Sequence, residues 1–323
     1  MKVKKLKIPG IKNNFHIKIK RLFSYIYAFS PIGYCLVYFH SLFHKKTKYK
    51  YECSLCLIFK NEAPYLKEWI EYHRLIGIEH FYLYNNNSDD NFRKVLDPYL
   101  NSSIVTLKDW TKNYAQAEAY QDCYSQAKKE THWLGFIDID EFINLYDLKN
   151  NDIKQVLKKF RRYPSIHLFW KIFGTSGIMK ENFSKTIIEQ FTSCWPWFTN
   201  EGKHIINNDW NFNLIWIHWS KAQYFGFPIF PITDSKMFTP YMQVYPYGNY
   251  NPKIAINHYW TKSKTYAKNK VNRSSAAEKK TEHIRKMNGM EFFELKCAIK
   301  DFSIQRWLVL LKEQLNNYSN ESQ

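Results

Sequence analysis

The sequence predicts an α/β protein whose mostly parallel sheet is covered by helices. The chain has 323 residues, of which 45% are apolar and 18% are aromatic, and this is enough to fill a substantial core. From residue 51 to residue 138, apolar runs of strand length alternate with segments whose apolar residues have helical spacing. An alternation of strand and helix at this spacing is typical of a parallel sheet with helices on its faces.

The first half of the chain supplies the regular part of this pattern. Strands are expected at 53–59, 80–84, 103–107 and 132–138, and helices over 61–77, around 91–99 and over 116–129. In the first of these helices Pro64 suits the first turn and Gly77 suits a C-terminal cap. The segment NNNSDD after the second strand is rich in turn-forming residues and ends that strand.

The second half is less regular. Strands are expected at 165–170, 185–191 and 214–220, with loops rich in Pro and Tyr at 225–234 and 241–252. After about residue 270 the chain becomes charged and helical. The sequence therefore divides into a basic arm over 1–51, a central domain over 52–270 and a C-terminal helical extension over 271–323.

The positive charge of the chain is concentrated in the arm. The formal net charge is +18, and residues 1–51 contain twelve Lys and Arg but no Asp or Glu. The remaining residues carry 35 basic and 29 acidic groups, an excess of only six. A basic nucleic-acid-binding protein is an alternative function, but this small excess argues against it, and we expect no nucleic acid partner.

The arm also contains an uncharged stretch from residue 22 to residue 43. Basic residues flank it on both sides, which favours a segment that lies on an anionic membrane surface. A single membrane-spanning anchor at 22–43 and an ordinary folded pair of helices are the alternatives. The six scattered cysteines favour a reducing compartment. We therefore expect a peripheral protein on the cytoplasmic face of a membrane.

Polar clusters follow four of the predicted strands, and ligands of open parallel sheets bind beyond those strand ends. The cluster after the fourth strand is DIDEF, in which Asp138 and Asp140 are two residues apart. If the strand continues through them, both carboxylates point into the cleft while Ile139 points into the core. Two carboxylates so close repel each other unless a cation compensates. A hard divalent ion, Mn²⁺ or Mg²⁺, is the natural partner.

Five segments of the sequence, in this order, resemble the metal-dependent glycosyltransferases of family 92 and their bacterial relatives. They are CLIFKNEAPYLKEWIEYHRLIGIEHFYLYNNNSDD, VTLKDW, WLGFIDIDEF, FGTSG and NHYWTKS, and they cover roughly residues 53–270. The resemblance implies a GT-A fold and transfer of a sugar from a nucleotide diphosphate sugar, with UDP as the expected nucleotide. The expected acceptor is a glycan or glycolipid in lipopolysaccharide or cell-surface polysaccharide synthesis. A relative that binds glycans without catalysis is a further alternative.

The resemblance also implies roles for individual residues. Asp140 would bind the metal, and Asp138 would touch the ribose or share the metal. The residues expected to line the nucleotide pocket are Asn61, Glu62, Asn86, Asn87 and Asp90. The alternative for the asparagine cluster is a plain turn, because Asn and Asp suit turns in any protein.

Further roles concern the diphosphate and the acceptor. His258 matches the position where this fold often returns a residue to the metal or diphosphate, with His218 as a competing candidate. Lys262 and Lys264 are candidates to neutralise the leaving diphosphate. An inverting transferase needs a general base, for which Glu189 and then Glu141 are the candidates.

Overall fold

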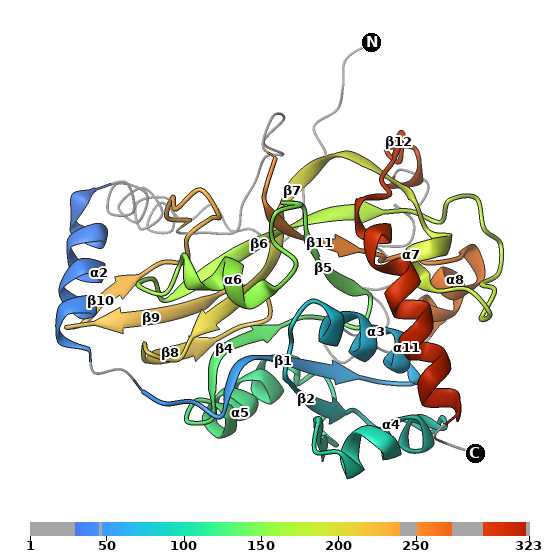
Figure 1. Cartoon of the computed structure of the whole chain (residues 1–323), viewed down its shortest axis with the longest axis horizontal. Helices are drawn as coiled ribbons and strands as arrows, with labels where there is room; N and C mark the ends of the chain where they lie inside the picture. The colour runs from blue at the N-terminus through green and yellow to red at the C-terminus, as the bar shows by residue number, and fades with distance from the viewer. Residues whose placement is uncertain (1–29, 45–46, 240–250, 273–292, 321–323) are drawn as a thin grey trace.

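The computed structural model describes residues 30–44, 47–239, 251–272 and 293–320 of the chain. Within these residues a nine-stranded sheet runs through the molecule in the order β3, β2, β1, β4, β7, β6, β11 and β5, with β12 paired to β7 (Figure 1). A separate sheet has the order β10, β9, β8. Helices cover the larger sheet, so the predicted α/β class is confirmed.

The first half of the chain builds the parallel part of the large sheet. Its elements are β1 (Tyr51–Phe59), α3 (Ala63–Leu75), β2 (His80–Asn85), α4 (Phe92–Asn101), β3 (Val105–Asp109), α5 (Gln116–Ala127) and β4 (Thr131–Phe136). Strand β1 pairs in parallel with both β2 and β4, and β2 pairs in parallel with β3. Each strand and helix predicted before residue 136 is present, with its ends shifted by a few residues. Pro64 lies in the first turn of α3, and Gly77 follows that helix with φ of +103°.

The second half adds antiparallel strands to the same sheet. Its elements are β5 (Glu141–Leu145), α6 (Ile153–Lys158), β6 (Ser165–Phe173), α7 (Ile187–Gln190), β7 (Ser193–Asn207), β11 (Ile254–His258), α8 (Lys264–Asn272) and β12 (Ile299–Lys300). Strand β7 runs antiparallel to β4 and to β6, while β11 runs parallel to β6 and antiparallel to β5. The second half of the sheet is therefore mixed.

Gly202 permits the close pairing of β7 with β6. The register between the two strands shifts after the Phe169–Gly202 pair, where β7 bulges. A Cβ atom at Gly202 would lie 1.9 Å from the carbonyl oxygen of Leu168, far inside van der Waals contact. Only glycine fits there, and it places the next residue, Lys203, on the sheet.

Two of the predicted strands are wrong. Residues 185–191 contain the short helix α7, because the carboxylate of Glu68 accepts hydrogen bonds from the backbone N–H groups of Ile187 and Ile188 at 2.8 and 3.3 Å. These two N–H groups begin the helix, where an anion is favourable. Residues 214–220 form a hairpin with a turn between β8 (Phe212–Ile215) and β9 (Ser220–Tyr224).

The small sheet lies beside helix α2 (Pro31–Phe43) at one end of the molecule, and α8 lies toward the other end (Figure 1). Strand β10 (Phe227–Ile229) completes this sheet. Helix α2 is the described part of the uncharged stretch 22–43, and residues 1–29 of the arm lie outside the described residues. None of the helices in the described ranges has both the length and the apolar content that a bilayer crossing requires.

The described end of the predicted C-terminal extension packs onto the central domain. It contains the 3₁₀ helix η1 (Ser303–Trp307) and α11 (Leu308–Asn320). The Lys67 ammonium of α3 donates a hydrogen bond to the Leu315 carbonyl of α11 at 2.8 Å. Helix α3 also contacts β5. The Trp69 indole N–H and the Tyr72 hydroxyl donate hydrogen bonds to the backbone carbonyls of Glu141 and Ile143 in that strand.

Candidate active site

The two aspartates lie in a turn between β4 and β5. The backbone N–H of Glu141 donates to the Asp138 carbonyl at 3.0 Å, which closes the turn. The Asp140 carbonyl accepts from Tyr259 N–H at 2.7 Å, just after β11. The prediction that the strand continues through both aspartates is therefore wrong, although Ile139 is buried as expected. The turn brings the carboxylates to the carboxyl end of the central strand.

Asp138 is held by three donors from neighbouring elements. Its carboxylate accepts from the Lys203 ammonium at 2.8 Å, from the Gln116 amide at 2.7 Å and from the Tyr120 hydroxyl at 3.0 Å. Burial raises the pKa of Asp138, but the charge of Lys203 outweighs burial and holds the pKa below its ordinary value. Lys203 is fully buried on β7. The two residues therefore form an ion pair in which the lysine is buried and the Asp138 side chain is 32% exposed.

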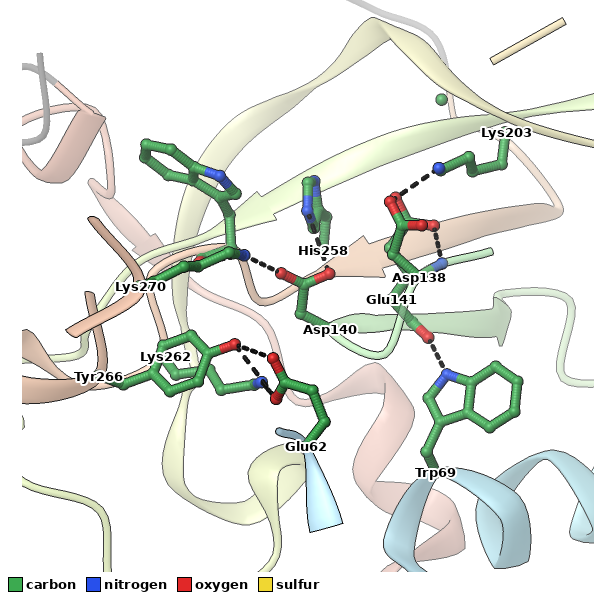
Figure 2. A network of polar contacts seen from close by, with 12 residues as sticks. Glu62, Trp69, Asp138, Asp140, Glu141, Lys203, His258, Lys262, Tyr266 and Lys270 are labelled. Carbon is green, nitrogen blue, oxygen red and sulfur yellow. Dashed lines mark hydrogen bonds and ion pairs between the residues drawn. The ribbon is translucent and has the colours of Figure 1, made fainter. Parts of the chain in front are cut away.

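Asp140 faces a different group of cations (Figure 2). Its Oδ2 lies 2.5 Å from the Lys270 ammonium of α8, and its Oδ1 lies 3.7 Å from Nε2 of His258. Burial raises the pKa of Asp140, but Lys270, His258 and Lys262 together lower it well below the ordinary value. Asp140 is therefore ionised throughout the physiological range.

Two histidines lie close to these carboxylates and flank the ring of Trp170. The ring centres of His258 and His218 are 4.5 and 5.3 Å from that of Trp170. Burial lowers the pKa of each histidine to about 4, so both are neutral at pH 7. Nδ1 of His218 lies 3.1 Å from the Gly202 carbonyl, which requires a proton on Nδ1 and leaves a lone pair on Nε2.

Glu141 is a buried carboxyl group that supports the turn. Its Oε2 accepts from the backbone N–H of Asp138 at 2.9 Å, and its Oε1 has no hydrogen-bond partner among the described residues. Burial raises the pKa of Glu141 well above its ordinary value, because the interior disfavours the charged form. The hydrogen bond to Asp138 gives this group a part in holding the turn, and its predicted role as a general base stays a prediction.

Glu62 begins a second polar cluster beside Asp140. Its carboxylate lies 3.6 Å from the Lys262 ammonium and accepts from the Tyr266 hydroxyl at 3.0 Å. The Lys262 ammonium also lies over the rings of Tyr65 and Tyr266, at 3.7 and 4.0 Å from their centres. Figure 2 shows this cluster below Asp140, on the side of Lys270. Glu62 and Lys262 thus lie beside Asp140, and their predicted contacts with the nucleotide and the diphosphate stay predictions.

The asparagine cluster connects the loops that follow β1, β2 and β3. Asn86 donates to the carbonyls of Trp110 and Lys112, and Asn87 donates to that of Thr111. Asn61 accepts from Asp89 N–H, and Asp90 accepts from Ala63 N–H. The predicted convergence of these strand ends is confirmed. The contacts of the cluster are those of a structural turn, so its predicted contact with nucleotide stays a prediction.

Two other predicted residues point elsewhere. Glu189 lies on α7, where its carboxylate pairs with the Lys312 ammonium of α11 at 2.9 Å. Lys264 is exposed at the start of α8. Lys203 and Lys270, which contact the two aspartates directly, are not among the residues predicted from the sequence. Lys203 follows the Gly202 bulge, and Lys270 lies 130 residues beyond Asp140, so no local motif marks either of them.

The residues fit a divalent metal ion with two protein ligands. Among the described residues, no group of three or more His, Cys, Asp and Glu side chains is arranged to hold a metal. Asp140 Oδ1 and His258 Nε2 are close together, and Nδ1 of His258 is buried without a hydrogen-bond partner in the described part of the chain. Mg²⁺ in proteins is often held by one or two side chains, with water and phosphate oxygens as its other ligands. Asp138 fits less well, because its partner Lys203 is fully buried, whereas Lys270 beside Asp140 is partly exposed and can move away from an incoming ion.

Comparison with known proteins identifies similar sequences. The sequence profile of glycosyltransferase family 92 matches residues 49–290, which is more than half of the chain. A family 92 protein of Ricinus communis is 34% identical over 139 residues, which cover 40% of this chain. A β-1,4-galactosyltransferase of Caenorhabditis elegans, galt-1, is 31% identical over 170 residues, which cover 46% of this chain.

The matched segments are only part of each relative. They span 24% of the Ricinus protein and 40% of the nematode protein. Among solved structures, TarS residues 1–349 from S. aureus has a TM-score of 0.34 and 16% identity. That match covers 49% of this chain and 47% of the TarS chain.

Proposed function

This chain belongs to glycosyltransferase family 92, and on that basis we propose that it transfers a sugar from a nucleotide diphosphate sugar to a glycan or glycolipid acceptor. The observation that carries the proposal is the position of Asp140. It lies at the carboxyl end of the central strand, beside His258 and the lysines Lys262 and Lys270. This end of a parallel sheet is where open α/β folds bind nucleotides.

The cations around Asp140 suit a donor that carries a diphosphate. Lys262 and Lys270 supply two positive charges on the same side of the site. A diphosphate leaving group gains negative charge as the sugar bond breaks, and fixed cations stabilise that charge. The neutral imidazole of His258 adds a nitrogen ligand next to them.

We propose that Mn²⁺ or Mg²⁺ is held by Asp140 and His258. Such an ion would neutralise the diphosphate oxygens of the donor. Asp138 then has a positioning role, because its pair with Lys203 and its hydrogen bond from Gln116 hold the turn that carries Asp140. Lys270 and the ion compete for the Asp140 carboxylate.

We propose His218 as the general base that removes the proton of the acceptor hydroxyl. Its contact with the Gly202 carbonyl leaves Nε2 able to accept a proton, and the charge of Asp138 would stabilise the imidazolium that forms. The rings of His218 and His258 both lie close to that of Trp170. If His218 is the base, His218→Asn lowers kcat, while Glu189→Gln retains it. If Glu189→Gln lowers kcat and His218→Asn does not, Glu189 is the general base.

The first donor to test is UDP-galactose, because galt-1 is named as a β-1,4-galactosyltransferase. We place the acceptor at an anionic membrane surface reached by the basic arm, consistent with lipopolysaccharide or cell-surface polysaccharide synthesis. The arm supplies the charge for that surface, with twelve basic and no acidic residues over 1–51.

Isothermal titration of the full chain with UDP, with and without Mn²⁺, tests the donor site. We expect UDP binding that requires Mn²⁺ and that is lost in Asp140→Asn. Asp97→Asn, which changes an exposed carboxylate on α4, is the matched control and should bind as the unmodified chain does. Failure of UDP, GDP and CMP to bind under both conditions would overturn the proposal.

A further inference from the structure

Helix α2 has an apolar face that none of the other described residues covers. Its sequence PIGYCLVYFHSLF has no charged residue. One face packs inward through Gly33, Val37 and His40, and the ring of His40 stacks on buried Trp210 at 3.6 Å. The residues of the opposite face are Ile32, Tyr38, Phe39, Leu42 and Phe43, and all are exposed, Phe43 to 75%. A helix that is apolar on all sides is normally buried, so this face requires a partner.

A hairpin of the small sheet extends this face. Strands β9 and β10 are joined by Phe225 and Gly226, which have φ of +48° and +80° as in a two-residue hairpin turn. The turn leaves the Phe225 side chain 82% exposed, and Phe227 beside it is also exposed. An aromatic residue held in the left-handed region at an exposed tip is unusual for a soluble surface.

Aromatic contacts join the hairpin to the helix. The ring of Tyr224 lies 5.2 Å from that of His40 on α2 and 4.5 Å from that of Phe225. Figure 1 shows α2 alongside the ends of β9 and β10 at the edge of the molecule. Tyr224 thus ties the hairpin to α2, and we call the five exposed residues of α2 together with Phe225 and Phe227 the α2–hairpin surface.

We propose that the α2–hairpin surface inserts into the outer layer of an anionic phospholipid membrane. Helix α2 has 13 residues and is about 20 Å long, whereas a bilayer core is about 30 Å thick, so α2 lies in the plane of the interface. Aromatic residues such as Tyr and Phe suit that depth. Lys48 and Lys50 are exposed just beyond α2, and the Tyr34 hydroxyl contacts the backbone of Lys236 at the other end. These lysines match an anionic lipid surface and not a purely apolar partner.

This inference deepens the proposed function by placing 225–227, far from the arm in sequence, on the membrane. The experiment measures vesicle binding by the full chain, so it does not depend on transferase activity. The probes are vesicles of phosphatidylcholine alone and of phosphatidylcholine with phosphatidylglycerol. Binding is followed by co-sedimentation at low and at high salt.

Three variants separate the contributions. We expect the double variant Leu42→Ser, Phe43→Ser to lower binding to the anionic vesicles at least tenfold, and Phe225→Ser to lower it about threefold to tenfold. Leu148→Ser, which changes an equally exposed apolar residue outside the surface, is the matched control and should bind as the unmodified chain does. All four chains should have the same far-UV circular dichroism.

Two results would overturn the proposal. One is Phe225→Ser bound as tightly as the unmodified chain, because the hairpin then takes no part. The other is equal binding to both kinds of vesicle together with a dimer, seen by sedimentation, that the α2 variants dissociate. In that case a second copy of the chain covers the surface. Neither result affects the titration with UDP, so the two proposals fail separately.

Discussion

The two ends of β4 each carry a cluster of buried charge, and the clusters are built differently. At the amino end, His132 lies between two carboxylates, with Nδ1 2.8 Å from Glu52 and Nε2 3.4 Å from Asp209. At the carboxyl end, Asp138 and Asp140 each have a lysine, Lys203 or Lys270. In the first cluster two carboxylates share one histidine, whereas in the second each carboxylate has its own lysine.

The difference separates a cluster that contributes to stability, at the amino end of β4, from one that can bind a ligand, at its carboxyl end. Against the effect of burial, the Asp209 and Glu52 carboxylates favour the protonated form of His132 and raise its pKa above the ordinary value. At the other end Asp140 pairs with Lys270 of α8, and the neutral imidazole of His258 lies alongside. The carboxyl end therefore offers a ligand a carboxylate and an uncharged ring nitrogen, whereas both ring nitrogens of His132 face carboxylates.

The largest effect is expected from Asp140→Asn. Removing this charge should lower the rate of sugar transfer by about 10³-fold, since electrostatic groups in enzyme sites contribute at this level. The rate is measured with UDP-galactose and any acceptor found active. The variant should unfold in urea at nearly the same concentration as the unmodified chain. A rate within threefold of that of the unmodified chain would contradict the assigned role of Asp140.

Lys203→Met tests whether the pair with Asp138 is structural. Asp138, whose side chain is 32% exposed, would lose its cation, and we expect the free energy of unfolding to fall by about 2 kcal/mol in urea titrations. Adding Asp138→Asn to the same chain should restore most of this loss. Lys112→Met, which breaks an exposed pair with Glu118, is the control and should change stability by well under 1 kcal/mol. Equal losses of unfolding free energy in Lys203→Met and Lys112→Met would show that the pair with Asp138 contributes no more than an exposed pair.

The amino-end cluster should make stability depend on pH. Burial lowers the pKa of His132, but its contacts with Asp209 and Glu52 outweigh burial and raise the pKa above the ordinary 6.5. The stability contributed by the charged histidine is complete below about pH 6.5 and is lost as the pH rises through the raised pKa. We expect this loss to be on the order of 1 kcal/mol. In His132→Gln the free energy of unfolding should change less over the same pH range, and an unchanged slope would exclude His132 as its source.

The smallest effect concerns competition at Asp140. Lys270→Met removes the ammonium next to that carboxylate, so we expect Mn²⁺ to bind up to about tenfold more tightly, as measured by titration calorimetry without nucleotide. Lys268→Met, on an exposed part of the same helix, is the control. Weaker binding of Mn²⁺ to Lys270→Met would show that Lys270 assists the ion instead of competing with it.

The regular half of the fold could be predicted from the sequence because its signals are local. Apolar periodicity and the turn residues around NNNSDD mark the strands and helices before residue 136. Helix α7 could not be predicted, because the carboxylate that begins it belongs to Glu68, over a hundred residues earlier. The turn at 216–219 contains none of the Gly, Pro or Asn that normally mark a turn.

Only part of the candidate site could be predicted, because only part of it is marked by local sequence signals. The aspartates follow the end of one strand and His258 is the last residue of another, so both positions can be recognised along the chain. Lys203 and Lys270 reach the aspartates through tertiary packing, and no local pattern distinguishes them from the other lysines. The sequence therefore predicts the negative groups of the site better than the positive ones.

The bulge at Gly202 restricts which mutations of its codon the protein can tolerate. A replacement there would place its Cβ against the Leu168 carbonyl and would displace Lys203 from Asp138. Every change in the first or second base of a glycine codon replaces the amino acid. In a library of random single-base mutants selected for sugar transfer, we therefore expect every active variant to encode glycine at position 202. Only silent third-base changes should be found in that codon. The side chain of the neighbouring Glu201 is exposed, so many replacements should be found at that position.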